Sequence, residues 1–155
     1  MDPLSYIQID ALQCEWDTAP YLLFSQNVDP LVYYSHLFPA VAILVLAIVV
    51  VLRNYRHLST RIFLSIAVFF TIFSLFDLIV WATEDPRYIM FFWSSLTYIE
   101  QLIYAATLYL FIVLSRQRDA SWTEKLFAAG LFLPIIFLGP THLNLQGFDY
   151  TNCWR

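Results

Sequence analysis

Four long apolar blocks constrain this chain more than any other feature of its sequence. They cover residues 36–52, 62–82, 89–115 and 126–140. A helix needs roughly 20 residues to cross about 30 Å of hydrocarbon, so the blocks have about the length of membrane spans. Only 13% of the residues are charged, about half the share found in soluble domains. The sequence therefore predicts an all-α integral membrane protein with four antiparallel transmembrane helices, since short links make consecutive helices neighbours.

The fourth block is the shortest of the four, and it contains Pro134. Proline has no backbone N–H and kinks a helix interior. A bilayer tolerates such a break only where other helices pack against it. We therefore expect the span over residues 126–140 to be kinked.

Basic residues indicate the orientation of the spans. Six of the eight lie in the loops after the first and third blocks: Arg53, Arg56, Arg61, Arg116, Arg118 and Lys125. Cytoplasmic loops hold the excess of Lys and Arg, so both loops are predicted to be cytoplasmic and both termini to lie outside the plasma membrane. Residues 1–35 then form an outer N-terminal segment, expected to fold against the outer helix ends or the membrane interface. Residues 141–155 form an outer loop, which we expect to be truncated.

Two cysteines, Cys14 and Cys153, fall on the predicted outer side. Disulfides persist in that environment. A bridge would tie the N-terminal segment to the loop after the fourth span. Two unpaired thiols are the alternative, because the separation of the two Cα atoms cannot be obtained from the sequence.

Polar side chains follow one face of each of two adjacent spans. The first stripe comprises Thr71, Ser74, Asp77 and Trp81, and the second comprises Trp93, Thr97, Glu100, Tyr104 and Thr107, with Gln101 beside it. An acid at the bilayer centre costs roughly 3 kcal/mol, so such residues usually face other helices. We place Asp77 and Glu100 in the outer half of the membrane, near each other, with no basic residue in the body of any span to act as counter-ion.

Two interpretations of these acids remain open. In one, Asp77 and Glu100 are neutral groups that join helices through hydrogen bonds to Ser74, Thr97, Gln101 and Tyr104. In the other, they line an outward-opening cavity for a ligand or cation, or meet a basic residue on further helices.

The sequence predicts neither an enzyme nor a metal or cofactor site. His36, His57 and His142 are scattered among an outer helix end, an inner loop and an outer loop. They therefore form no metal-binding set. The chain has no glycine-rich phosphate loop and no nucleophile motif. No nucleic-acid partner is expected.

A family resemblance runs through the second to fourth spans. It is carried by FDLIVWATEDPRYIMFFWSSLTYIEQLIYAATLYLFIVL, followed by LPIIFLGPTHLNLQGFDYTNCWR. Its elements are an acid and a tryptophan late in the second span, the MFFWS entry to the third span with an acid midway, and the outer loop with GFD and TNC. The region 38–155 resembles the first four helices of the N-terminal seven-helix sensor region of bacterial histidine kinases.

The resemblance implies half of a seven-helix bundle. Such a sensor receives an outer or intramembrane ligand and passes the signal to a cytoplasmic kinase core. This chain lacks a phospho-accepting histidine helix, an ATP-binding domain and helices five to seven, so kinase activity is not carried over to it. We expect a sensory module without an output domain. A small structural or assembly subunit of a membrane complex is the alternative. A small transporter with Asp77 and Glu100 in a cation path is disfavoured, because repeated halves are absent.

Overall fold

The computed structural model describes residues 20–25, 28–83, 85–130 and 132–139. Every element in these ranges is helical. They are η1 (Pro20–Leu22), α2 (Pro30–Asn54), α3 (Leu58–Ala82), α4 (Pro86–Arg116), α5 (Trp122–Gly130) and α6 (Leu133–Leu138). Three helices within these ranges, α2, α3 and α4, are long and apolar enough to cross a membrane. The chain is therefore an all-helical protein of membrane-spanning character, as the apolar blocks predict.

Asp–Pro pairs define the starts of α2 and α4. The Asp29 carboxylate accepts from the backbone N–H of Leu31 at 2.8 Å, with Pro30 as the first helical residue. The Asp85 carboxylate accepts from the N–H of Arg87 at 2.9 Å in the same way. A capping side chain satisfies an otherwise unpaired N–H, and proline at the first position loses no helix bond. α2 therefore begins at Pro30, inside the range 1–35 that was predicted to be the outer N-terminal segment.

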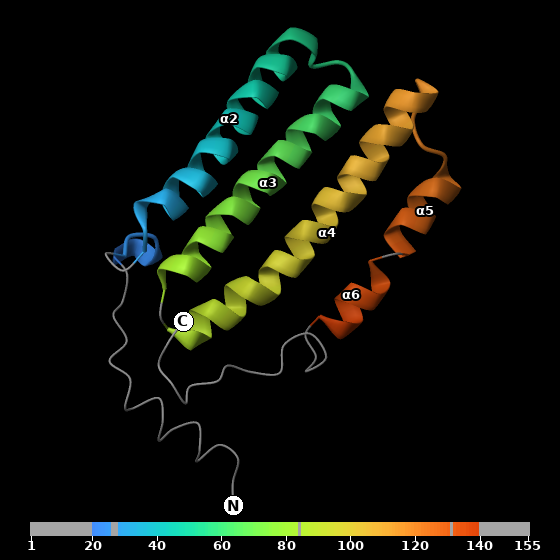
Figure 1. Cartoon of the computed structure of the whole chain (residues 1–155). Helices are drawn as coiled ribbons and strands as arrows, with labels where there is room; N and C mark the ends of the chain where they lie inside the picture. The colour runs from blue at the N-terminus through green and yellow to red at the C-terminus, as the bar shows by residue number, and fades with distance from the viewer. Residues whose placement is uncertain (1–19, 26–27, 84, 131, 140–155) are drawn as a thin grey trace, which may run out of the picture.

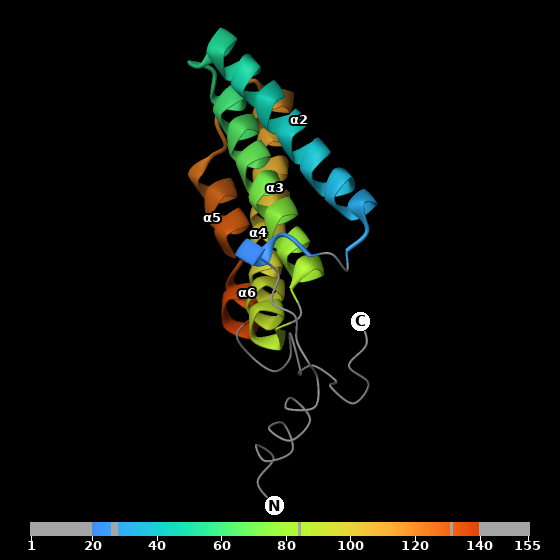
Figure 2. The same ribbon diagram turned by 90° about the vertical axis from the view of Figure 1, so that its left-hand side faces the viewer.

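α3 lies between α2 and α4 and packs against both (Figures 1 and 2). The buried positions are mainly small residues, including Ala40 and Ala47 of α2 and Ala67 and Ala82 of α3. Small side chains let helix backbones approach closely, which is how helices associate in a bilayer. Large apolar side chains instead point outward, with Leu52 77% exposed. A lipid environment accounts for this inverted distribution.

The N-terminal end of α2 is held by residues just before it. Val28 is buried and packs with Ala82, Val32 and Tyr33. The backbone N–H of Ser25 donates to the Tyr33 hydroxyl at 2.9 Å. These contacts fix the entry to α2 against the end of α3. Cys14, Cys153 and the outer loop over residues 141–155 lie outside the described residues, as does His142.

Two short helices, α5 and α6, occupy the region of the predicted fourth span. They lie beside α4 (Figure 1). The break follows Gly130, four residues before Pro134. Proline cannot donate to the carbonyl four residues earlier, and its ring clashes with that carbonyl, so the helix stops there. Pro134 itself lies in the first turn of α6, where its missing N–H is harmless. The structure thus has two helices where one kinked helix was expected.

Candidate functional site: a histidine–aspartate pair between two helices

The polar stripe of α3 faces α2. The Thr71 hydroxyl donates to the carbonyl of Ala67 in its own helix at 2.8 Å and reaches the Ala40 carbonyl of α2 at 3.4 Å. Ser74 is buried on the same helix. Asp77 also contacts α2, through His36. Thr71 and Asp77 of this stripe are therefore directed toward α2.

The partner of Asp77 is His36. His36 Nε2 lies 2.7 Å from Asp77 Oδ2, and the two side chains are 22% and 29% exposed. The expectation that no basic residue could pair with the intramembrane acids is wrong for Asp77. The error came from the boundary of the first span, which placed His36 at the helix end.

Depth within the bundle explains why this pair forms. His36 is six residues into α2, and Asp77 is five residues before the end of α3. At 1.5 Å per residue, His36 is about 9 Å from the N-terminus of α2, and Asp77 is about 8 Å from the C-terminus of α3. These two helix termini lie at the same end of the bundle, so the two side chains lie at similar depth. The Asp29–Pro30 capping pair is the sequence signal that would have revealed this match.

The hydrogen bonds of His36 determine which ring nitrogen carries a fixed proton. Nδ1 lies 2.7 Å from the carbonyl oxygen of Val32. A carbonyl oxygen can only accept, so Nδ1 must be the donor. The Ser35 hydroxyl, 3.1 Å from Nδ1, itself donates to the Val32 carbonyl at 2.9 Å. The second ring nitrogen, Nε2, is left to share a proton with Asp77.

One proton therefore lies between His36 Nε2 and Asp77 Oδ2. The pair is either imidazolium with carboxylate or neutral imidazole with carboxylic acid, and its net charge is zero in both forms. Zero net charge lowers the cost of placing the pair in a low-dielectric environment. Adding a second proton would leave one uncompensated positive charge.

Glu100 has a different partner. The Tyr104 hydroxyl, one turn further along α4, donates to Glu100 Oε1 at 2.7 Å. Tyr104 is 58% exposed. Gln101 and Tyr104 line a small cavity of about 120 Å³ on the side of α4 that faces α5. Thr97 is half-buried on the same helix. The two acids thus have different hydrogen-bond partners, His36 for Asp77 and Tyr104 for Glu100.

A second polar cluster joins α4 to the start of α5. Arg116 pairs with Glu124, and Lys125 Nζ lies 2.7 Å from Asp119 Oδ2. The hydrogen bond from Lys125, reinforced by one from the Tyr109 hydroxyl, holds the pKa of Asp119 below its usual value. Arg116 and Lys125 had been interpreted only as determinants of topology, and the structure adds these ion pairs.

A capping box at the start of α5 is the signal that sequence reasoning missed. Glu124 Oε2 accepts from the backbone N–H of Ser121 at 2.7 Å, while the Ser121 hydroxyl lies 3.4 Å from the N–H of Glu124. Serine followed three residues later by glutamate marks a helix start. The pattern places the start of α5 at Trp122 instead of residue 126.

Every element of the described residues is a helix, and three of these helices are long and apolar enough to cross a membrane, which indicates a helical membrane protein as the class of the chain. Among the described residues, no three His, Cys, Asp or Glu side chains gather as a metal site would require. The chain matches no protein-family model, no curated protein and no solved structure.

Proposed function

We propose that this chain is a membrane-embedded sensory module, as its resemblance to the N-terminal sensor region of histidine kinases implies. The observation that carries the proposal is the hydrogen bond between His36 and Asp77. It joins two helices through a single exchangeable proton, so a change at the pair alters the contact between the helices. The proposed output partner is a cytoplasmic kinase core that follows three further helices.

The proposed arrangement is an antiparallel bundle with four membrane crossings and both termini outside the plasma membrane. Contacts between α2 and α3 support it: moving along α2 from His36 to Ala40 corresponds to moving back along α3 from Asp77 to Thr71. The α2–α3 and α4–α5 turns lie at one end of the bundle (top of Figure 1), and six basic residues lie in these turns or in the adjoining helix ends. That distribution favours a cytoplasmic end.

α5 and α6 are proposed to form the fourth crossing together. They extend from Trp122 to Leu138, a length of about 25 Å at 1.5 Å per residue.

Proline near the pair favours movement at the outer end of α2. Pro39 lies inside α2, three residues after His36. It has no N–H for the carbonyl of Ser35, four residues earlier, so the helix is weakened beside the pair. Breaking one hydrogen bond there can therefore change the direction of the first two turns of α2. A sensory element needs such a two-state contact.

The test is a distance measurement between the outer ends of α2 and α3 in lipid nanodiscs. Spin labels are placed at Leu31 and Trp81, which are exposed, after replacement of both native cysteines by serine. The distance distribution is recorded by pulsed electron paramagnetic resonance for the labelled protein with and without the substitution His36→Ala. We expect the helix ends to separate in His36→Ala, where the hydrogen bond to Asp77 is lost.

Asp77→Asn is the matched control. The asparagine side chain has both a donor and an acceptor, so it retains a hydrogen bond to Nε2. The variant is expected to keep the short distance. A distance that does not change in His36→Ala would instead favour the structural or assembly subunit.

A further inference from the structure

A large cavity separates α5 from α4. Its volume is about 810 Å³, within the range of about 300–1,000 Å³ typical of ligand sites. α5 and α6 are held to α4 at their two ends, by the Arg116–Glu124 ion pair at one and by the close approach of Tyr98 to Gly139 at the other. The middle of the interface is left open.

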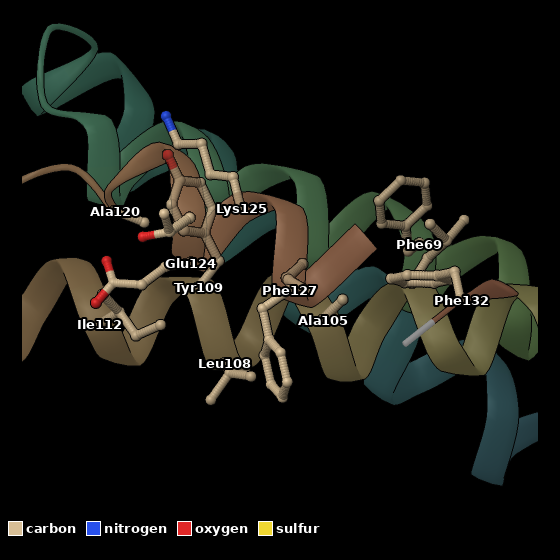
Figure 3. Close-up of a pocket in the computed structure, with 14 residues that line it drawn as sticks. Phe69, Ala105, Leu108, Tyr109, Ile112, Ala120, Glu124, Lys125, Phe127 and Phe132 are labelled. Atoms are coloured by element: carbon tan, nitrogen blue, oxygen red, sulfur yellow. The ribbon is translucent and has the colours of Figure 1, made fainter. Parts of the chain in front are cut away.

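The cavity is polar at only one end. Figure 3 shows Tyr109, Glu124 and Lys125 grouped at one end, whereas Phe69 and Phe132 lie at the other. The lining between them is apolar. An occupant that matches this distribution has one polar end and a long apolar body.

The cavity is also elongated along the helices. Its α4 lining extends from Leu102 to Ile112, ten residues and about 15 Å along the helix axis. Alanines of both helices, Ala105 and Ala106 of α4 and Ala128 of α5, make room in its wall. The long axis follows α4, hence the direction in which lipid chains lie in a bilayer.

Apolar walls gain packing contacts when an apolar group lies between them. The nearest source of apolar chains for a membrane protein is the bilayer itself. The ions at the polar end already have partners, Asp119 for Lys125 and Arg116 for Glu124. The cavity therefore selects the chain of a lipid more than the charge of its headgroup.

We propose that the cavity binds one acyl chain of a phospholipid from the leaflet beside the α4–α5 turn, with the ester end of the chain near Tyr109 and Lys125. The proposal goes beyond sensing and does not require it. In this proposal, α5 and α6 hold the lipid chain against α4.

Adjacent alanines of α5 provide the experiment. Ala128 lines the cavity, whereas Ala129 is exposed and does not line it. Ala128→Trp and Ala129→Trp proteins are purified in mild detergent from membranes supplied with a phospholipid that carries a photoreactive acyl chain. Cross-linking and native mass spectrometry give the lipid bound per chain. We expect Ala128→Trp to lower occupancy roughly tenfold or more, because overpacking expels the chain, and Ala129→Trp to leave it unchanged.

Ala105→Leu is a milder variant that fills the α4 wall of the same cavity and is used if Ala128→Trp does not fold, as judged by circular dichroism and gel filtration. It should also lower occupancy. Equal lipid occupancy in folded cavity-filling variants and in Ala129→Trp would overturn the proposal. Loss of a dimer in these variants, with bound lipid unchanged, would overturn it in favour of a second copy of the chain.

Discussion

The residue that matters most at the site is one that the sequence analysis set aside. The sequence identified Asp77 as an unusual intramembrane acid, because its position in an apolar block is evident without a structure. Its partner was missed because His36 is separated from it by 41 positions and belongs to a helix whose start was placed too late. Sequence spacing relates residues within one helix, whereas a partner on another helix depends on register.

Removal of the histidine should destabilise the bundle. His36→Ala leaves Asp77 without its hydrogen-bond partner in a low-dielectric environment. We expect the free energy of unfolding to fall by roughly 1–3 kcal/mol, measured by denaturant titration in detergent micelles. His57→Ala is the control, since His57 is exposed and its side chain makes no capping hydrogen bond at the start of α3. Equal effects of the two substitutions would refute a stabilising role for the pair.

At the scale of elements, the sequence predicted the three long helices, and local chemistry set their limits. Asp29 and Asp85 begin helices earlier than the apolar blocks do, because capping acts through polar residues outside those blocks. The fourth block was predicted as one kinked helix. Pro134 instead ends α5 at Gly130, because it cannot donate a hydrogen bond to the Gly130 carbonyl. Hydropathy alone cannot distinguish a kink from two helices.

Two glycines of the α5–α6 region differ in their surroundings. A Cβ at Gly139 would collide with the Tyr98 hydroxyl and would lie 2.6 Å from the carbonyl oxygen of Ile135, whereas a Cβ at Gly130 would meet nothing within 4 Å. Gly139→Ala should therefore lower stability by roughly 1–3 kcal/mol. Gly130→Ala should be neutral or stabilising by up to about 1 kcal/mol. Thermal unfolding of both variants in detergent checks this order, and a reversed order would contradict the docking of α6 on α4.

The pH dependence of the α4–α5 turn follows from Asp119. Its pKa is lowered in the folded protein, mainly by the hydrogen bond from Lys125. The stabilisation is therefore present above the unfolded-state pKa and is lost as the pH falls through the folded-state pKa. Asp119→Asn should lower the Tm at pH 7, and the difference from the wild type should disappear as the pH falls from about 4. High salt should reduce the difference at pH 7. A difference that persists at acidic pH would show that charge is not its cause.

At the scale of the whole molecule, small residues form the helix contacts and large apolar residues face outward. The apolar blocks are enough to predict that large apolar residues face outward, since a bilayer removes the need for a polar surface. They are not enough to predict the cavity between α4 and α5, because the cavity depends on the distance between these two helices. The two polar clusters have different roles in the proposed arrangement: the His36–Asp77 pair joins α2 to α3 near the outer face, and the Asp119 cluster fixes α5 near the cytoplasmic face.

The proposed function depends on the hydrogen bond by which His36 of α2 and Asp77 of α3 share one proton. The most direct test is ¹⁵N NMR of histidine-labelled protein in lipid nanodiscs, with His36→Ala used to assign the resonances. The nitrogen shifts distinguish protonated from unprotonated ring positions. We predict that Nδ1 of His36 is protonated at neutral pH and that Nε2 is hydrogen-bonded in the wild type, with a shift that moves on Asp77→Ala substitution. A neutral ring protonated at Nε2 with a bare Nδ1, or an Nε2 shift unaffected by Asp77→Ala, would contradict the shared proton.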